Sequence, residues 1–290
     1  MDFDPNLTPY KQKLMLALDV DSREKAEEWV HKLKAHVGYF KVGLQLFTKE
    51  GPELVRSIRA RGGRIFLDVK YHDIPNTVAK ACESASALGV DFINVHALGG
   101  REMMRAAAES LAATSARMRL AKPRLLAVTI LTSHDARSLG QEVGLKGRPE
   151  AEVRRLALLA KAAGCDGVVC SPREIKLVRE ACGKGFIIVT PGVRPPGAPK
   201  HDQKRTLGSG AALAAGADYL VVGRPITEAP DPVEAVLALA RDMRASMEAA
   251  PAGAKAAQGR ATAGAAGASK GRGKAGGAKA KSKAAAGRRA

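Results

Sequence analysis

Short apolar runs alternate with longer segments of helical periodicity from Lys13 to about Met247. The runs are rich in Val, Ile and Leu, as is typical of buried strands in a parallel sheet. Segment 22–35 has the helical pattern, because Ser22 can cap its start and Trp29 and Leu33 lie four residues apart on one face. We therefore expect strands, each followed by a helix, at 14–20, 39–44, 64–70, 92–97, 125–131, 167–170, 186–190 and 219–223.

The number of these strand and helix units indicates the fold. Eight parallel strands, each with its own helix, close naturally into an α/β fold of the (β/α)8 TIM barrel type. A chain of 290 residues, of which 46% are hydrophobic, can bury such a core. An open, doubly wound sheet is the alternative, but it more often has fewer strands. We expect the barrel to occupy residues 1–248 as one domain.

The composition changes abruptly after Met247. Residues 251–290 carry 10 basic and no acidic residues among Ala and Gly, so the net charge of +18 falls to +8 for the first 250 residues. A segment without aromatic residues or a periodic apolar face cannot offset the entropy of ordering its chain. We expect 249–290 to form a disordered basic tail that binds polyanions weakly and without sequence specificity.

The cysteines and the N-terminus bear on the cellular compartment. Cys82, Cys165, Cys170 and Cys182 form neither a CxxC pair nor a metal-ligand cluster, so reduced thiols are expected. The N-terminal sequence MDFDPNLTPYKQK lacks the basic and apolar regions of a signal peptide, and no apolar run approaches the roughly 20 residues of a membrane span. These features predict a cytoplasmic protein that does not enter the membrane.

Polar residues stand at the carboxyl ends of the predicted strands. In a TIM barrel these ends meet at one face, which is where barrel enzymes place their active sites. One charged residue at a strand end is most often merely solvated, but a whole ring of them is harder to explain in that way. Together with Gly223, the ring comprises Asp19, Lys41, Asp68, Lys70, His96, Thr132, Ser133, Ser171, Arg194 and Arg224.

Asp68, Lys70 and Asp73 form the densest charged cluster. On a strand, Asp68 and Lys70 point to the same side, and Asp73 follows where the chain turns toward the next helix. Two carboxylates beside one ammonium group favour its charged form, which suits Lys70 to donate a proton as a general acid. The alternative is an ion-pair network that only orders the loop.

The run DVKYHDIPNT at 68–77 resembles the signature of the orotidine 5′-phosphate decarboxylase family. The short pattern D-x-K-x-x-D is shared with related sugar-phosphate lyases, whereas DIPNT joined to the later phosphate-loop blocks is specific. The resemblance covers residues 14–227. Its further blocks, in the expected order, are LALD (16–19), FKVG (40–43), NVHA (94–97), LTS (131–133), TPGVRP (190–195), DQKR (202–205) and VGRPIT (222–227).

The resemblance implies loss of CO2 from orotidine 5′-monophosphate to give UMP, the last step of de novo UMP synthesis, with no cofactor and no metal. Lys70 would be the proton donor in an alternating charged array with Lys41, Asp68 and Asp73. The resemblance also implies a homodimer with shared active sites, in which Asp73 and Thr77 serve the neighbouring subunit. The other implied substrate contacts are Asp19 and Lys41 at the ribose, Asp68 at the substrate carboxylate, Thr132 near the base, and Arg194, Gln203, Gly223 and Arg224 at the phosphate.

Residues after the last two strands point to phosphate independently of the resemblance. TIM-barrel enzymes often hold phosphate with the loops after strands seven and eight. Gly223 permits close approach of the backbone, and Arg224 supplies charge-assisted hydrogen bonds. The Gly- and Pro-rich segment 191–199 suits a loop that closes over a ligand, and an ordinary connecting loop is the alternative.

Two other functions stay open at this point. A related magnesium-dependent enzyme, such as a 3-keto-sugar-phosphate decarboxylase or a hexulose-phosphate synthase, would act through an enediolate. Lys41 and Lys70 would compete with that metal for the space beside Asp68 and Asp73. A nucleic-acid-binding protein would act through the basic tail, which lacks aromatic stacking residues. Activity in EDTA would distinguish the decarboxylase from the magnesium-dependent enzymes. Turnover after removal of the tail would distinguish it from a protein that acts through the tail.

Overall fold

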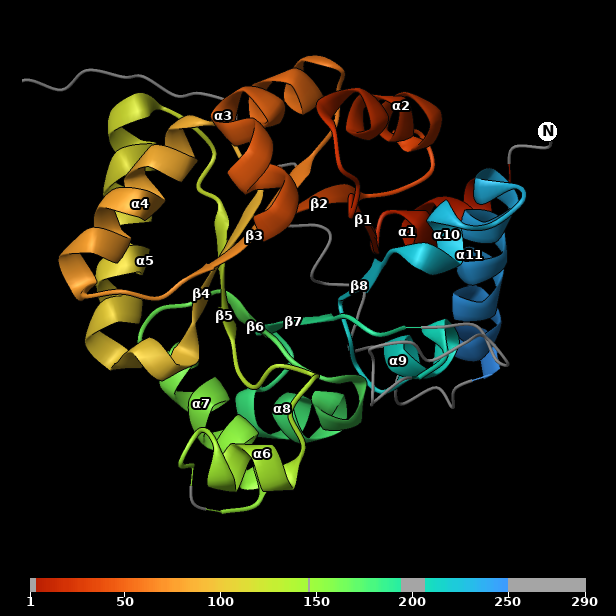
Figure 1. The fold of residues 1–290 in the computed structure, drawn as a ribbon. Helices are drawn as coiled ribbons and strands as arrows, with labels where there is room; N and C mark the ends of the chain where they lie inside the picture. Colours follow the sequence, from red (N-terminus) through yellow and green to blue (C-terminus); the bar gives the residue numbers. More distant parts are fainter. Residues whose placement is uncertain (1–3, 146, 194–206, 250–290) are drawn as a thin grey trace, which may run out of the picture.

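The computed structural model describes residues 4–145, 147–193 and 207–249. Within these residues, eight parallel strands form a closed barrel in sequence order (Figure 1). The ladder between the last and the first strand closes it, with Leu14 paired to Leu220. The predicted TIM barrel is confirmed and the open sheet is excluded. The strands are β1 (Leu14–Ala17), β2 (Tyr39–Gly43), β3 (Ile65–Tyr71), β4 (Phe92–His96), β5 (Arg124–Val128), β6 (Gly167–Val169), β7 (Ile187–Thr190) and β8 (Tyr219–Val222).

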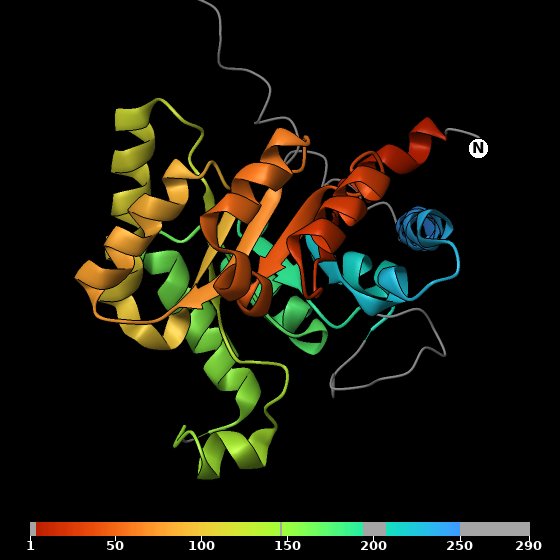
Figure 2. The ribbon, with the colours of Figure 1, turned by 45° about the horizontal axis from the view of Figure 1, so that its top comes forward.

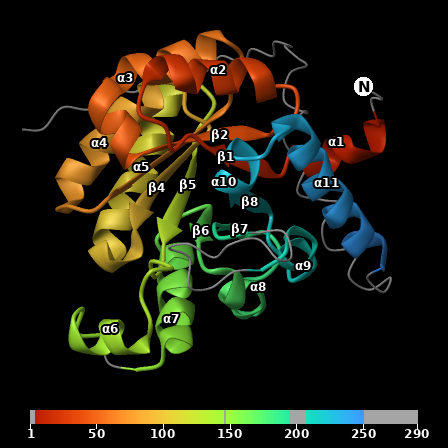
Figure 3. The same ribbon diagram turned by 45° about the vertical axis from the view of Figure 1, so that its right-hand side comes forward.

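Helices surround the barrel (Figure 2). The predicted helix at 22–35 is α2, where Ser22 Oγ accepts a hydrogen bond from the Lys25 backbone N–H at 3.3 Å. Helix α11 packs against α1 and α9, on the side of the barrel where β8 meets β1 (Figure 3). The α-helices are α1 (Thr8–Lys11), α2 (Arg23–Leu33), α3 (Leu44–Ala60), α4 (Pro75–Ala87), α5 (Gly100–Met118), α6 (Ala136–Gln141), α7 (Pro149–Ala162), α8 (Ile175–Cys182), α9 (Ser209–Ala214), α10 (Arg224–Thr227) and α11 (Pro232–Ala249), and the 3-10 helices are Pro5–Leu7, Ala97–Gly99 and Pro172–Glu174.

Two strands end earlier than their apolar runs. β1 ends at Ala17 and β5 at Val128, each three residues before its predicted end. The apolar residues just beyond these ends, Leu18 and Ile130, are buried in the main core although they are outside the strands. Hydrophobicity therefore reports burial here and not strand pairing. As a consequence, the polar residues that follow lie on loops at the mouth of the barrel.

The interior of the barrel is filled near the amino ends of the strands. Tyr39, Phe92 and Tyr219 are the first residues of β2, β4 and β8, and their rings pack edge to face with centroids 5.0 to 5.6 Å apart. Met15 and Phe66 belong to the same buried cluster. Such filling makes a TIM barrel a packed core and not a pore. The space that can receive a ligand is therefore at the carboxyl ends.

Burial and hydropathy limit what the cysteines and helices can do. All four cysteines fall within the described residues and are buried free thiols. Burial raises the pKa of Cys82 and Cys165 to about 12, so neither thiol is activated as a nucleophile.

Among the helices that the structure describes, none is long and apolar enough to cross a membrane. Helix α11 ends at Ala249, one residue beyond the expected end of the barrel domain at 248, and the rest of the predicted tail, 250–290, lies outside the described residues.

Three aspartates repeat one contact at the amino ends of the strands. Each lies two residues after a glycine with positive φ that follows a helix, and each accepts a hydrogen bond from a backbone N–H near the start of the preceding strand. Each carboxylate also pairs with a basic side chain. The three are Asp91 with Ile65 N–H (2.7 Å) and Arg59, Asp166 with Leu125 N–H (2.8 Å) and Lys122, and Asp218 with Ile188 N–H (2.8 Å) and Arg179.

Replacement of Asp218 by alanine tests this contact. The variant leaves the Ile188 N–H and the Arg179 guanidinium without their shared acceptor, so we expect the free energy of unfolding to fall by about 2–4 kcal/mol. Urea unfolding followed by circular dichroism measures the loss. Glu234→Ala is the matched control, because the exposed Glu234–Arg241 pair contributes little. Equal losses in the two variants would contradict the structural role of the repeat.

Candidate active site

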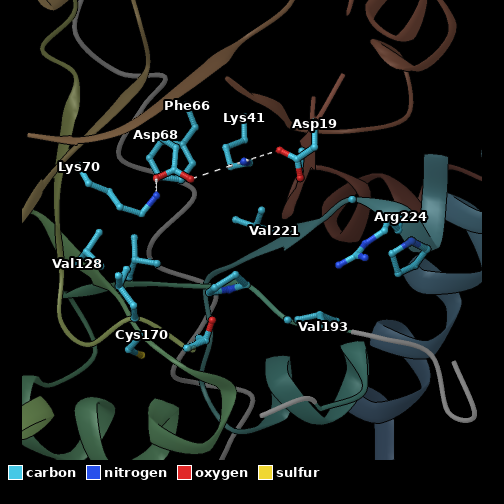
Figure 4. A pocket seen from close by; sticks show the side chains of 18 of the residues that line it. Asp19, Lys41, Phe66, Asp68, Lys70, Val128, Cys170, Val193, Val221 and Arg224 are labelled. Atoms are coloured by element: carbon cyan, nitrogen blue, oxygen red, sulfur yellow. Dashed lines mark hydrogen bonds and ion pairs between the residues drawn. The ribbon is translucent and has the colours of Figure 1, made fainter. Parts of the chain in front are cut away.

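A cavity of about 260 Å³ opens at the carboxyl ends of the strands. Charged residues from the β1 to β3 side form one wall, and Arg224, after β8, lies across the cavity from Lys70 (Figure 4). The structure thus brings together most of the predicted site residues. Those that line the cavity are Asp19, Lys41, Asp68, Lys70, Thr132, Gly223 and Arg224.

Four charged side chains alternate in sign along one wall (Figure 4). Lys41 Nζ lies 3.0 Å from Asp19 Oδ1 and 3.7 Å from Asp68 Oδ2. Lys70 Nζ lies 2.7 Å from Asp68 Oδ1. The side chains of Lys41 and Asp68 are only 11% and 14% exposed, whereas that of Asp19 is 66% exposed. Charge interactions weaken in water, so the contacts around Asp68 are the strong ones in this array.

Asp68 is held as a carboxylate. Burial by itself would raise the pKa of Asp68, but the charges of Lys41 and Lys70, together with hydrogen bonds from Lys70 and Asn94, outweigh burial and lower it below its ordinary value. Asp68 therefore keeps its negative charge at neutral pH. A ligand that enters the cavity meets a fixed carboxylate beside a fixed ammonium group.

Lys70 reaches Asp68 through an irregular backbone and not through the regular alternation of a strand. Between Leu67 and Tyr71, β3 advances four residues while β4 advances two, so β3 carries two extra residues here. Lys70 lies within this bulge and has a φ of +52°. The left-handed conformation costs a non-glycine residue about 1–2 kcal/mol. A bulge can re-aim a side chain, and this one directs Lys70 into the cavity.

Asn94 of β4 contacts both members of this pair. Its side chain is fully buried, its Oδ1 accepts a hydrogen bond from the Lys70 backbone N–H at 2.8 Å, and its Nδ2 donates to Asp68 Oδ1 at 2.7 Å. No role was predicted for Asn94 from the sequence. The available signal was a polar residue inside the apolar run 92–95, because a buried amide needs hydrogen-bond partners.

Gly223 and Arg224 form part of the opposite wall, at the end of β8. A Cβ atom on Gly223 would lie 3.3 Å from the Ala17 Cβ and 3.6 Å from Asp19 Oδ2. Glycine therefore lets the chain after β8 pass close to the end of β1. Residues 191–193, which follow β7, line the same region.

The floor between the two walls is apolar. Val128, Val169 and Val221 line it from β5, β6 and β8, and Ile130 adds to it from the loop after β5. Thr132 also lines the cavity. The cavity thus joins a charged wall, an apolar middle and a cationic end, which suits a ligand with a polar part, an apolar part and an anionic end.

Two of the predicted site residues are described but do not line the cavity, and two others are not described. In the described part of the chain, Asp73 and Thr77 are exposed around the start of α4 and do not line the cavity. Pro75, between them, is the first residue of α4. Arg194 and Gln203 lie outside the described residues.

Two histidines stack near Lys70. The rings of His72 and His96 lie 5.5 Å apart with an interplanar angle of 14°. Burial, and then the charges of His72, Lys70 and His134, lower the pKa of His96 to about 4, so this ring is neutral at physiological pH. Among the described residues, no group of three or more His, Cys, Asp or Glu is placed to hold a metal ion.

Known proteins are similar to this chain in sequence and in fold. The model of the Orotidine 5'-phosphate decarboxylase / HUMPS family matches residues 12–239. An orotidine 5'-phosphate decarboxylase of Syntrophotalea carbinolica is 55% identical over 242 residues, which cover 83% of this chain and 99% of that protein. One of Moorella thermoacetica is 52% identical over 233 residues, which cover 80% of this chain and 92% of that protein. The crystal structure of orotidine 5'-phosphate decarboxylase from Lactobacillus acidophilus has a TM-score of 0.71 and 38% identity, and the match covers 79% of this chain and 98% of that one.

The family match extends over the whole barrel. Residues 12–239 contain all eight strands and every residue named above as lining the cavity. The relatives are matched over nearly their full length, so the likeness is not confined to one motif. The chain belongs to the orotidine 5′-phosphate decarboxylase / HUMPS family, as the run at 68–77 predicted.

Proposed function

We propose that this protein decarboxylates orotidine 5′-monophosphate to UMP and CO2, the last step of de novo UMP biosynthesis, with Lys70 as the proton donor. The observation that carries the proposal is the Asp68–Lys70 pair, which is closed to 2.7 Å and faces a cavity with Arg224 at its other end. Relatives that match this chain over more than 90% of their length bear the name of the decarboxylase, which supports the same reaction here.

The charged wall suits the chemistry of this reaction. The bond from C6 to the carboxylate breaks, its electron pair stays on C6, and CO2 leaves. Lys70 Nζ then gives its proton to C6 and regains one from solvent. A substrate carboxylate about 4 Å from Asp68 would be repelled by about 4 kcal/mol at an effective dielectric constant near 20, and that repulsion ends when CO2 departs. The developing negative charge at C6 is meanwhile stabilised by the Lys70 ammonium group.

The remaining residues of the site are assigned to different parts of the substrate. Asp19 and Lys41 are assigned to the ribose and Thr132 to the base, which lies over the apolar floor. Gly223 and Arg224 take the phosphate, together with Arg194 and Gln203. The phosphate is remote from the bond that breaks, so its binding energy can organise the site and lower the barrier.

The proposed reaction needs no cofactor and no metal. Both oxygens of Asp68 already face ammonium groups, from Lys70 on one side and Lys41 on the other. A divalent cation that took Asp68 as a ligand would stand beside two positive charges, which opposes its binding. This arrangement favours the decarboxylase over the magnesium-dependent relatives.

The proposal extends to a homodimer with shared active sites. Asp73 and Thr77 are exposed at the start of α4, and between them Ile74 is 67% exposed. Leu44, at the start of α3, is 55% exposed. Large apolar side chains at this level of exposure suit a surface that a second subunit covers. In such a dimer, Asp73 of one chain would reach the Lys70 of the other.

The proposed setting is the cytoplasm, where the free thiols of the four cysteines stay reduced. The basic tail is proposed as an accessory that binds polyanions weakly through its 10 positive charges. The barrel contains the catalytic groups, so turnover does not require the tail.

Lys70→Ala tests the reaction and the proton donor together. We expect wild-type protein in EDTA to deplete the ultraviolet absorbance of orotidine 5′-monophosphate rapidly and the variant to show essentially no turnover, because the proton source is gone. Lys49→Ala is the matched control, since it removes a lysine that does not line the cavity. A wild-type enzyme that is active only with added magnesium would contradict the proposed function.

Arg224→Ala tests the phosphate end of the cavity. Loss of the charge-assisted hydrogen bonds should lower kcat/KM for orotidine 5′-monophosphate by at least about tenfold. Arg241→Ala, on the outer helix α11, should leave kcat/KM unchanged. A near-normal value for Arg224→Ala would refute the assigned role.

Mixed dimers test the sharing of the site. Lys70→Ala and Asp73→Asn chains are co-expressed with different tags, and the dimers that carry both tags are isolated. Each mixed dimer contains one site with Lys70 and Asp73 both intact, so we expect about half of the wild-type activity per dimer. Mixed dimers as inactive as Lys70→Ala homodimers would contradict the assignment of Asp73 to the partner's site.

A further inference from the structure

Asn94 is a buried polar residue that lies behind the cavity wall. It is on β4, its relative exposure is 0%, and it is not among the residues that line the cavity. The adjacent residues of β4 that share its burial are apolar. Burial of an amide among apolar side chains costs free energy unless its donor and its acceptor both form hydrogen bonds. In Asn94 both groups form hydrogen bonds, and both partners belong to the charged wall.

The acceptor of Asn94 serves the irregular backbone at Lys70. The two extra residues of β3 take this segment out of regular pairing with β4 between Leu67 and Tyr71. The Lys70 N–H donates instead to Asn94 Oδ1 at 2.8 Å. A left-handed lysine persists only where its surroundings hold it in place. The Asn94 side chain replaces a ladder acceptor at the residue whose φ is +52°.

The donor of Asn94 orients the carboxylate of Asp68. Asp68 Oδ1 accepts from Asn94 Nδ2 at 2.7 Å and from Lys70 Nζ at 2.7 Å, while Oδ2 faces Lys41 Nζ at 3.7 Å. With Nδ2 in place, the carboxylate cannot rotate without breaking a hydrogen bond. Each carboxylate oxygen therefore keeps its own ammonium partner.

We propose that Asn94 is a positioning residue that aligns Lys70 and Asp68 for proton transfer, a role that rests on the proposed function. The Asn94 amide links the main chain of the proton donor, Lys70, to the side chain of its counter-ion, Asp68. Two short hydrogen bonds from one rigid group fix the relative position of the two. Asn94 does not line the cavity and acts through these two residues, so its removal should affect kcat and not binding.

Asn94→Leu and Asn94→Asp form a matched pair of similar size. Asn94→Leu removes both hydrogen bonds, and we expect kcat to fall by about ten- to a hundredfold, as for loss of a hydrogen bond to a charged group. The affinity for UMP should stay within about twofold of the wild-type value, since no wall residue is removed. Ser115→Ala, which removes another buried hydrogen bond on α5, should leave kcat unchanged. A kcat of Asn94→Leu within about twofold of wild type would overturn the proposal, as would an equal loss in kcat and in UMP affinity.

Asn94→Asp adds a readout that a general packing role would not produce. The introduced carboxyl group can still accept from the Lys70 N–H, but when ionised it repels Asp68 and cannot donate to it. Protonation restores the donor, and the charged or titratable groups around it are Asp68 and Lys70 of β3, Lys41 of β2 and His96 of β4. A buried carboxyl group beside another carboxylate takes up a proton readily. We expect the ratio of variant to wild-type kcat to rise as the pH is lowered from about 8 to about 5, with no such rise for Asn94→Leu. A flat ratio for Asn94→Asp would overturn the proposal.

Crystal structures of the two variants separate this proposal from the proposed function. If wild-type protein does not turn over orotidine 5′-monophosphate, the proposed function fails, and the backbone at Lys70 still reports on Asn94. We expect the φ of Lys70 to leave the left-handed region, or the Asp68–Lys70 contact to open, in Asn94→Leu. An unchanged Lys70 backbone and an unchanged contact with Asp68 in that variant would overturn the positioning role.

Discussion

The pairing of β8 with β1 is the constraint on which the rest of the structure depends. Met15 lies opposite Val221 and Leu16 opposite Val222, so the two ends of the folded chain share one ladder. Closure places the carboxyl ends of all eight strands around one mouth. It also brings the chain after β8 against the chain after β1, where a Cβ on Gly223 would lie 3.6 Å from the Asp19 carboxylate. Without closure, the charged wall and the cationic end would not face the same cavity.

The barrel concentrates charge at the mouth because its interior is otherwise full. The aromatic rings of Tyr39, Phe92 and Tyr219 block the amino end, and apolar side chains cover the floor. Asp68 is thus surrounded by protein on most sides, and Lys41 and Lys70 provide the charge that offsets its burial. The strained backbone at Lys70 belongs to the same arrangement, because Lys70 lies in the bulge of β3 and its ammonium group contacts Asp68.

Much of the fold could be predicted because strand and helix periodicity are local properties of the chain. The positions of all eight strands follow from their apolar runs, and Asp19, Lys41, Asp68 and Lys70 follow from their places at or near the strand ends. The predicted strand ends were less accurate, as at β1 and β5, because Leu18 and Ile130 are buried without strand pairing. The expected contact between Asp68 and Lys70 is present, but it forms within a bulge of β3 and not along a regular strand.

The sequence by itself determined the eight strand and helix units, the family and the chemical identity of the charged residues, since each depends on residue types and their spacing along one segment. Tertiary structure alone decided two sets of contacts: that Lys41 lies between Asp19 and Asp68, and that Asn94 joins Asp68 to the backbone of Lys70. These contacts depend on the register between neighbouring strands and on the left-handed turn at Lys70. Both are set by packing and hydrogen bonding between segments distant in sequence, which local periodicity does not encode.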